Sequence, residues 1–116
     1  MSYPEIAILG AGPVGLEAAL AAVAAGRSFR IFEAGLEVAS NVRQWGHVRL
    51  FTHWDMSVSE RMRQALEDSG QVVPSGDRCP TGTELVDQVL RPVSELPDVG
   101  PWLRPDSRVI EIGREG

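Results

Sequence analysis

The sequence predicts an α/β fold, in which a parallel sheet is covered by helices, and three observations support this prediction. A short apolar run, residues 6–9, leads into a glycine-rich turn at residues 10–15. Strong helix formers, mostly alanine, occupy residues 16–25. A second apolar run, residues 28–32, ends at Glu33. Strands that alternate with a helix in this way indicate a βαβ unit, which belongs to a parallel sheet.

The turn meets the spacing Gly-x-Gly-x-x-Gly in full at Gly10, Gly12 and Gly15. In this pattern the first glycine lets the chain reverse tightly, and the second removes a side chain that would keep the backbone away from a pyrophosphate. The third allows the helix to pack close against the strand. The helix directs its free N–H groups and the positive end of its dipole at the turn, where Pro13 loses nothing by lacking an N–H. The stretch therefore predicts a phosphate-binding turn.

Glu33 stands at the tip of the second strand, about 20 residues after the turn. A carboxylate at this position can accept hydrogen bonds from both hydroxyls of an adenosine ribose. Gly26 follows the helix, as expected for a residue just past a helix C-terminus. The alternative is a glycine-bent βαβ unit with a solvated glutamate. We favour dinucleotide binding because the turn, the helix and Glu33 occur together.

Length and charge limit the other possibilities. The chain has 116 residues, the size of one small domain, and we treat 1–116 as a single unit. Strands are found for little more than one of the two halves of a dinucleotide-binding domain, so the sequence predicts the first half of an incomplete domain. The net charge of −5, the pI near 4.9 and the lack of a basic run argue against a nucleic-acid partner.

Few side chains are candidates for catalysis or metal binding. Cys79 is the only cysteine, so the sequence has no intrachain disulfide and no zinc or redox cysteine pair, which is in keeping with a cytoplasmic protein. The spacing of His47, His53 and Asp55 matches no metal-binding pattern, so we predict no metal site. The apolar stretch 6–25 is interrupted by glycines and carries Glu17, so we predict no membrane span. We identify no catalytic residue, as expected if a cofactor supplies the chemistry.

A long segment, residues 34–56, is predicted to be irregular because it contains turn residues and little periodicity. It is rich in tryptophan, histidine and arginine. In one interpretation the segment lies along a cofactor, with Arg43 near phosphate and Trp45 or Trp54 against a ring or ribose. In the other, the tryptophans anchor the loop to the core and the charged residues are solvated. The sequence leaves both open.

The second half of the chain predicts two helices and a third strand. Ser57 and Glu60 form a capping box ahead of a helix that runs to about residue 69. Another cap at residues 81–84 begins a helix that Pro92 ends or kinks. Residues 95–107 are predicted to be coil, and residues 108–112 a strand.

With these motifs in place, the chain resembles the N-terminal part of FAD-dependent oxidoreductases, particularly flavin-containing monooxygenase-like and pyridine-nucleotide-disulfide-reductase-like flavoproteins. The resemblance is carried by residues 6–19 and 31–34. It implies a Rossmann-like FAD/NAD(P)-binding fold and a set of cofactor-binding residues. That set is Gly10, Ala11, Gly12, Pro13, Val14, Gly15, Glu33, Ala34, Arg43 and Trp45.

The resemblance also has departures. The Gly-Gly-x-Trp element of flavin-containing monooxygenases is replaced by residues 42–46, and the cysteine pair of the disulfide reductases is absent. The later elements of such families lie beyond residue 116. We therefore expect an FAD-binding, monooxygenase-like portion that is not catalytically complete alone, with a nicotinamide as electron donor in the complete protein. The alternatives are an NAD-binding module and a non-catalytic interaction domain, and we expect self-association or a completing chain.

Overall fold

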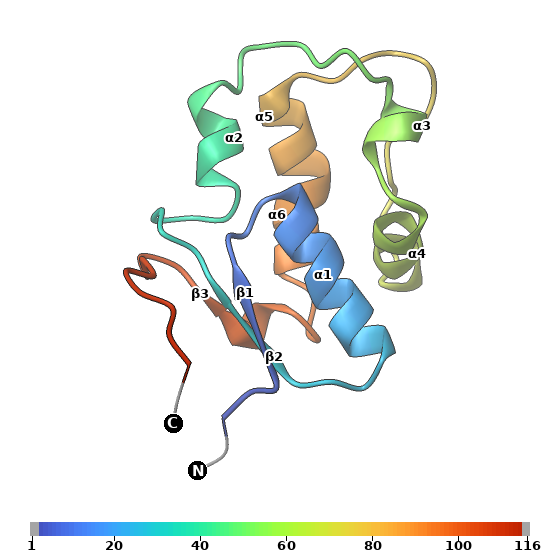
Figure 1. Cartoon of the computed structure of the whole chain (residues 1–116). Helices are drawn as coiled ribbons and strands as arrows, with labels where there is room; N and C mark the ends of the chain where they lie inside the picture. Colours follow the sequence, from blue (N-terminus) through green and yellow to red (C-terminus); the bar gives the residue numbers. More distant parts are fainter. Residues whose placement is uncertain (1–2, 115–116) are drawn as a thin grey trace.

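Three parallel strands form the sheet of the computed structural model, which describes residues 3–114 (Figure 1). They are β1 (Ile6–Leu9), β2 (Phe29–Phe32) and β3 (Leu103–Arg104), and β2 lies between the other two. In the register, Ile8 pairs with Ile31, which pairs with Leu103. The predicted α/β class and the first two predicted strands are confirmed.

Helix α1 (Pro13–Ala24) connects β1 to β2, as predicted. Its buried residues contact the sheet and the neighbouring helices; they are Leu16, Ala19, Leu20 and Ala22. Gly26 follows the helix and its C-cap Ala25, and its φ of +68° is in the left-handed region. The Gly26 N–H donates to the Val23 carbonyl (3.1 Å) and the Arg27 N–H to the Ala22 carbonyl (2.9 Å). These two bonds form a Schellman motif, which turns the chain back toward the sheet.

The segment 34–56 is not wholly irregular, so that prediction is wrong in part. It contains α2 (Ser40–Gln44) and the start of α3 (Trp54–Ser57). Helices of four or five residues carry too little apolar periodicity to be recognised, and they depend on tertiary contacts. Here Val42 and Trp54 supply those contacts, since both are buried in the core.

Helix α4 (Glu60–Asp68) begins later than predicted. Its cap is Ser59, whose hydroxyl accepts the Met62 N–H at 3.0 Å. The predicted cap, Ser57, instead ends α3, and its hydroxyl bonds with Thr52. Since α3 takes up Ser57, the next serine along the chain becomes the first residue free to cap α4. Met62 and Leu66 of this helix are buried, together with Val58 just before it.

The next helix is continuous but contains a π-helical turn. It consists of α5 (Gly82–Leu85), a π-helical turn η1 (Val86–Leu90) and α6 (Arg91–Ser94). Thr81 and Glu84 form the predicted capping box. The π turn ends two residues before Pro92, whose ring cannot follow a regular α-helical turn. The helix continues past Pro92 to Ser94, so Pro92 does not end it, and the departure from regular α-helix is the π turn before it.

The third strand lies elsewhere than predicted. A 3₁₀ turn, η2 (Gly100–Trp102), leads into β3, whereas residues 108–112 form neither strand nor helix. Leu103 and Arg104 already occupy the free edge of β2, so the later residues have no strand to pair with there. The chain then turns at Asp106 (φ +52°). The Ser107 N–H donates to the Glu33 carbonyl at 2.8 Å, which ties this segment to the end of β2.

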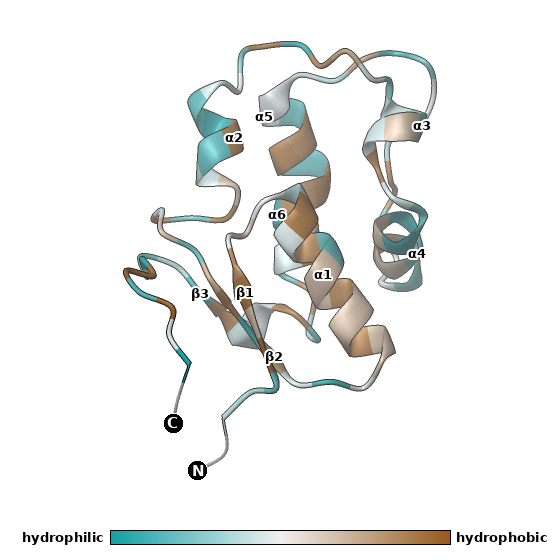
Figure 2. Ribbon diagram, viewed as in Figure 1, coloured by the Kyte–Doolittle hydropathy of each residue, from teal (hydrophilic) through white to brown (hydrophobic). Residues whose placement is uncertain are grey.

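The two faces of the sheet differ. Ile8, Ile31 and Leu103 share a register level and pack into the core that α1 covers. Figure 2 shows apolar residues of β1 and β2 beside those of α1. The alternate residues face the other way and are more exposed; they include Ala7, Leu9, Arg30 and Phe32. A parallel sheet normally has both faces covered, so this second face is unusual.

Candidate functional site

The glycine turn has the geometry that its spacing predicts. Gly10 has a φ of +103°, a conformation that other residues rarely adopt. A Cβ on Gly15 would lie 1.9 Å from the Gly10 carbonyl oxygen, so only glycine fits there. A Cβ on Gly12 would meet no heavy atom within 4 Å. The turn is closed between Gly10 and Gly15 and open in front of Gly12.

Helix α1 presents unpaired donors at this opening. Its N-cap, Gly12, has no side chain to accept a hydrogen bond, and no acidic residue lies in the first turn. Within residues 3–114, the N–H groups of Gly12, Val14 and Gly15 have no protein acceptor. Free N–H groups and the positive end of the helix dipole together form a typical anion-binding site.

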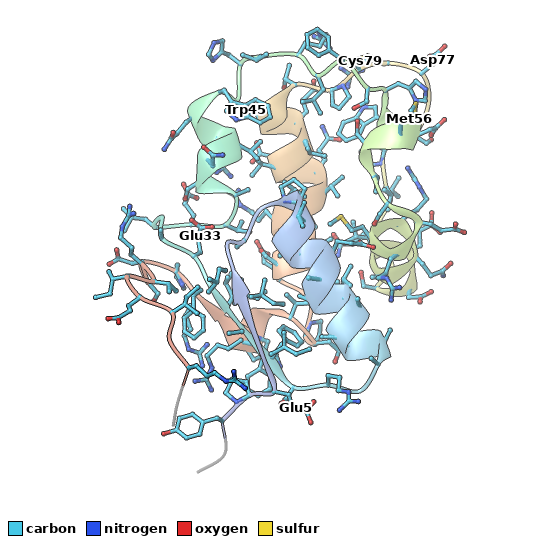
Figure 3. The ribbon with its side chains drawn as sticks, viewed as in Figure 1. Glu5, Glu33, Trp45, Met56, Asp77 and Cys79 are labelled. Atoms are coloured by element: carbon cyan, nitrogen blue, oxygen red, sulfur yellow. The ribbon has the colours of Figure 1, made fainter. Side chains whose placement is uncertain are left out.

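Glu33 is buried at the carboxyl end of β2, where Figure 3 shows it between the strands and α2. Its Oε1 accepts the Ala11 N–H at 2.8 Å, and its Oε2 accepts the Gly35 N–H at 2.7 Å. The carboxylate thus joins the glycine turn to the loop after β2. Each carboxylate oxygen has a further lone pair, so Glu33 can still accept two donors from a ligand.

The loop after Glu33 is held against the same turn. The Ala39 N–H donates to the Ala11 carbonyl at 2.9 Å, and Ala39 has a φ of +55°. A Cβ on Gly35 would lie 2.0 Å from the Ser40 hydroxyl oxygen. Sequence reasoning missed the roles of Gly35 and Ala39. The position of Gly35, two residues after Glu33, was a usable signal for a tight turn.

A hollow of about 590 Å³ lies beside Glu33, at the end of β1 and β2. It brings together Gly10, Glu33 and Ala34 from the predicted set, and it adds Asn41 and the segment 107–112, which sequence reasoning did not assign to a site. No periodicity links residues 107–112 to residue 33. The pairing of β3 with β2 and the hydrogen bonds at Asp106 and Ser107 bring them there.

Arg43 and Trp45 do not line this hollow. Trp45 packs against the start of α5, since a Cβ on Gly82 would lie 2.9 Å from the Trp45 ring (Figure 3). Arg43 pairs with Glu37 (3.7 Å) and Asp87 (3.1 Å). Arg91 pairs with the same two carboxylates, at 3.5 Å and 3.7 Å. This four-residue charge ring ties the loop to the helix formed by α5, η1 and α6.

The remaining polar residues give little chemistry. Trp54 is buried, and His53 lies beside it in the sequence with its Nδ1 buried and without a partner in the described part of the chain.

Between residues 3 and 114, no three His, Cys, Asp or Glu side chains come together in a way that could hold a metal ion. Across the same residues, no helix has the length and apolar character needed to cross a membrane.

Among residues 3–114, the one strongly shifted carboxyl belongs to a helix cap. The Arg78 side chain and the Thr81 backbone N–H donate to Glu84 and lower the pKa of this carboxyl from 4.5 to about 2. Glu84 in turn raises the pKa of the Arg78 guanidinium. Glu84 lies outside the hollow beside Glu33, and its interactions are those of a capping box.

Solved structures that share the fold include the following three. The bacillithiol disulfide reductase Bdr (YpdA) from Staphylococcus aureus matches with a TM-score of 0.76 and 20% identity, over 100% of this chain and 32% of that chain. An oxidized steroid monooxygenase bound to NADP matches with a TM-score of 0.69 and 24% identity, over 90% of this chain and 20% of that chain. FAD-bound OTEMO gives a TM-score of 0.71 and 19% identity, over 93% of this chain and 20% of that chain.

The chain thus spans at most about a third of the length of these proteins. No protein-family model and no curated protein matches the sequence. The predicted resemblance to FAD-dependent oxidoreductases is confirmed at the level of the fold. This chain has the fold of the N-terminal, Rossmann-like FAD-binding region of such enzymes.

Proposed function

We propose that the chain binds the ADP part of FAD at the glycine turn and Glu33. The observation that carries the proposal is the open space in front of Gly12, where a Cβ would meet nothing within 4 Å, beside three N–H groups without protein acceptors. A pyrophosphate fits this combination because it needs close backbone approach and several donors. The sequence contains no lysine, so these backbone N–H groups, rather than a lysine side chain, would bind the phosphates.

Glu33 would accept the ribose hydroxyls with the lone pairs that Ala11 and Gly35 leave free. The same carboxylate would repel a 2′-phosphate, so NADP is disfavoured at this turn. NAD carries the same adenosine ribose and stays the alternative ligand. FAD is favoured because OTEMO, which shares the fold, was solved with FAD bound.

A bound flavin would supply hydride and electron transfer. The residues of this chain would hold and orient its ADP end. We further propose that the chemistry is monooxygenase-like, with a nicotinamide as electron donor in the complete protein. Cys79 is the only cysteine of this sequence, which does not favour the disulfide-reductase type. The structures of the steroid monooxygenase and OTEMO include NADP.

We also propose that the part of the second face around Leu9 is covered in the working protein, by another copy or by further polypeptide. Leu9 on this face is half exposed, and Ile110 and Ile112 beside it are largely exposed. Exposed apolar side chains that adjoin one another favour association. Sedimentation of the purified chain tests this: a stable monomer over a wide concentration range would rule out self-association.

The first experiment is a visible absorption spectrum of the purified chain, with chromatography of the supernatant after heat denaturation. Released FAD would support the proposal. If the protein is colourless, titration with FAD and with NADH follows. Saturable binding of NADH but not FAD would favour the NAD alternative, and binding of neither would contradict dinucleotide binding by this chain.

Substitution of Glu33 tests the ribose assignment. We expect Glu33→Ala to weaken FAD binding by about 1.5–3 kcal/mol, through the loss of charge-assisted hydrogen bonds. FMN lacks the adenosine, so its affinity should not change. Circular dichroism must show that the variant is folded, because the Ala11 and Gly35 N–H groups also lose their acceptor. Unchanged FAD affinity in a folded variant would contradict the assignment.

A further inference from the structure

A second hollow, of about 400 Å³, lies at the opposite end of the sheet from the glycine turn. Three parts of the chain form it: the residues before β1, the turn from α1 into β2, and the segment before β3. The residues used below are Tyr3, Arg27, Arg30, Asp98 and Trp102. The hollow shares no lining residue with the hollow beside Glu33, so it does not depend on the proposed FAD site.

Arg30 is the reason to regard this hollow as a binding site. Its Nε is buried and has no hydrogen-bond partner, and its guanidinium has no ion pair within residues 3–114. Arg30 is partly buried, and proteins normally provide a partner for such a guanidinium; the Nε itself is closed to a ligand in the hollow, so the ligand would bind the remaining N–H groups. Arg27 also lines the hollow but has Glu5 at 3.7 Å, in a pair that is exposed. Among residues 3–114, Arg30 is thus the cation of the hollow that has no ion pair.

Aromatic side chains lie around this cation. Trp102 is 44% exposed, which is unusual for so large an apolar side chain, and Tyr3 is also exposed. Both line the hollow. Aromatic rings at such a position can stack on a planar ligand, and a guanidinium binds a carboxylate with two parallel hydrogen bonds. Asp98 lines the hollow too, so a second negative charge on the ligand would be repelled.

We propose that this hollow binds a small planar organic monoanion, of the aromatic carboxylate class. The carboxylate would pair with Arg30, and the ring would lie against Trp102. The volume suits one such molecule, since ligand sites usually begin at about 300 Å³. The monoanion is preferred over a phosphate ester because of Asp98.

An NMR titration of the ¹⁵N-labelled chain with 2-naphthoate tests the proposal. The Nε–H of Arg30 reports on the guanidinium to which it belongs, and the indole N–H of Trp102 reports on the ring contact. We expect both signals to shift with the same saturable midpoint. Acetate lacks the ring, 2-naphthalenemethanol lacks the charge, and 2-naphthyl phosphate has a second charge. Each of these should bind at least about tenfold more weakly.

The matched variants are Arg30→Gln and Arg61→Gln. Arg61 is an arginine of α4 that pairs with Glu17 and does not line this hollow. We expect Arg30→Gln to weaken 2-naphthoate binding about ten- to a hundredfold, and Arg61→Gln to change it less than about twofold. If Arg30→Gln does not fold, the comparison of 2-naphthoate with the three other ligands on the wild-type chain still tests the proposal. Equal binding of the alcohol and the carboxylate, no shift up to about 10 mM, or unchanged affinity in Arg30→Gln would overturn the proposal.

Discussion

The glycine turn and the loop that follows β2 lie at the same end of the sheet, but they are held in place in different ways. The turn is shaped by contacts between near neighbours, such as the close approach of Gly15 to Gly10. The loop is fixed by residues about 30 positions later in the chain. The Leu50 N–H donates to the Pro80 carbonyl (2.8 Å), and the Trp54 N–H donates to the Arg78 carbonyl (3.0 Å).

This difference explains why the sequence predicted the turn correctly and the loop only in part. A turn that depends on its own residues can be predicted from a sequence motif. A loop that depends on distant residues differs from other segments only in its amino-acid composition. Trp54 illustrates the second case. It is 2% exposed, and therefore anchors the loop to the core as one of the two original interpretations held. Trp45 packs on α5 in the same way.

The largest effect is expected from the loop anchor. Trp54→Ala removes a fully buried side chain and should lower the free energy of unfolding by about 3–5 kcal/mol. Urea denaturation followed by circular dichroism measures this. Trp102→Ala, at an exposed tryptophan, is the control and should cost far less. A small loss in Trp54→Ala would mean that the loop is not anchored through this residue.

The next largest loss of stability is expected at Gly15, and this loss distinguishes Gly15 from Gly12. Gly15→Ala places a methyl group against the Gly10 carbonyl and should lower the free energy of unfolding by about 1–3 kcal/mol. Gly12→Ala has open space and an ordinary φ of −91°, so its stability should be unchanged. FAD affinity, in contrast, should fall in Gly12→Ala because the methyl group enters the proposed phosphate site. Equal stability of the two variants would contradict the close packing at Gly15.

A smaller effect is expected at the charge ring. Arg43→Gln breaks two exposed ion pairs and should change the free energy of unfolding by less than about 1 kcal/mol. Since Arg43 pairs with Glu37 and Asp87 and does not line the hollow beside Glu33, FAD affinity should stay within about twofold. Fluorescence titration of FAD measures it. A tenfold loss would instead support the cofactor contact predicted for Arg43 from the sequence.

The smallest effect concerns the helix cap that adjoins the loop. The pKa of Glu84 is lowered from 4.5 to about 2 by Arg78 and Thr81. A carboxyl with a lowered folded-state pKa adds stability above its ordinary pKa, and this contribution is lost as the pH falls from about 4.5 to about 2. NMR titration of the Glu84 carboxyl measures the pKa directly. Arg78→Gln should move it back toward 4.5, and an unchanged value would contradict the role of Arg78.

The sequence by itself determined the βαβ unit, the glycine turn, Glu33 at the end of β2 and the caps at Gly26 and Thr81. Each depends on residues close together in the chain, whose conformational preferences do not need the rest of the molecule. The tertiary structure alone decided that the third strand is Leu103–Arg104 rather than residues 108–112. A strand of two residues has no periodicity, and its place depends on which edge of β2 is free.

The tertiary structure alone also decided how the site is enclosed. Glu33 binds two backbone N–H groups from different segments, and residues 107–112 lie across the hollow beside it. Arg30 and Trp102 are 72 positions apart in the sequence, yet both line the second hollow. These arrangements depend on long-range packing, in which a side chain gains its partners only after the sheet and helices have come together.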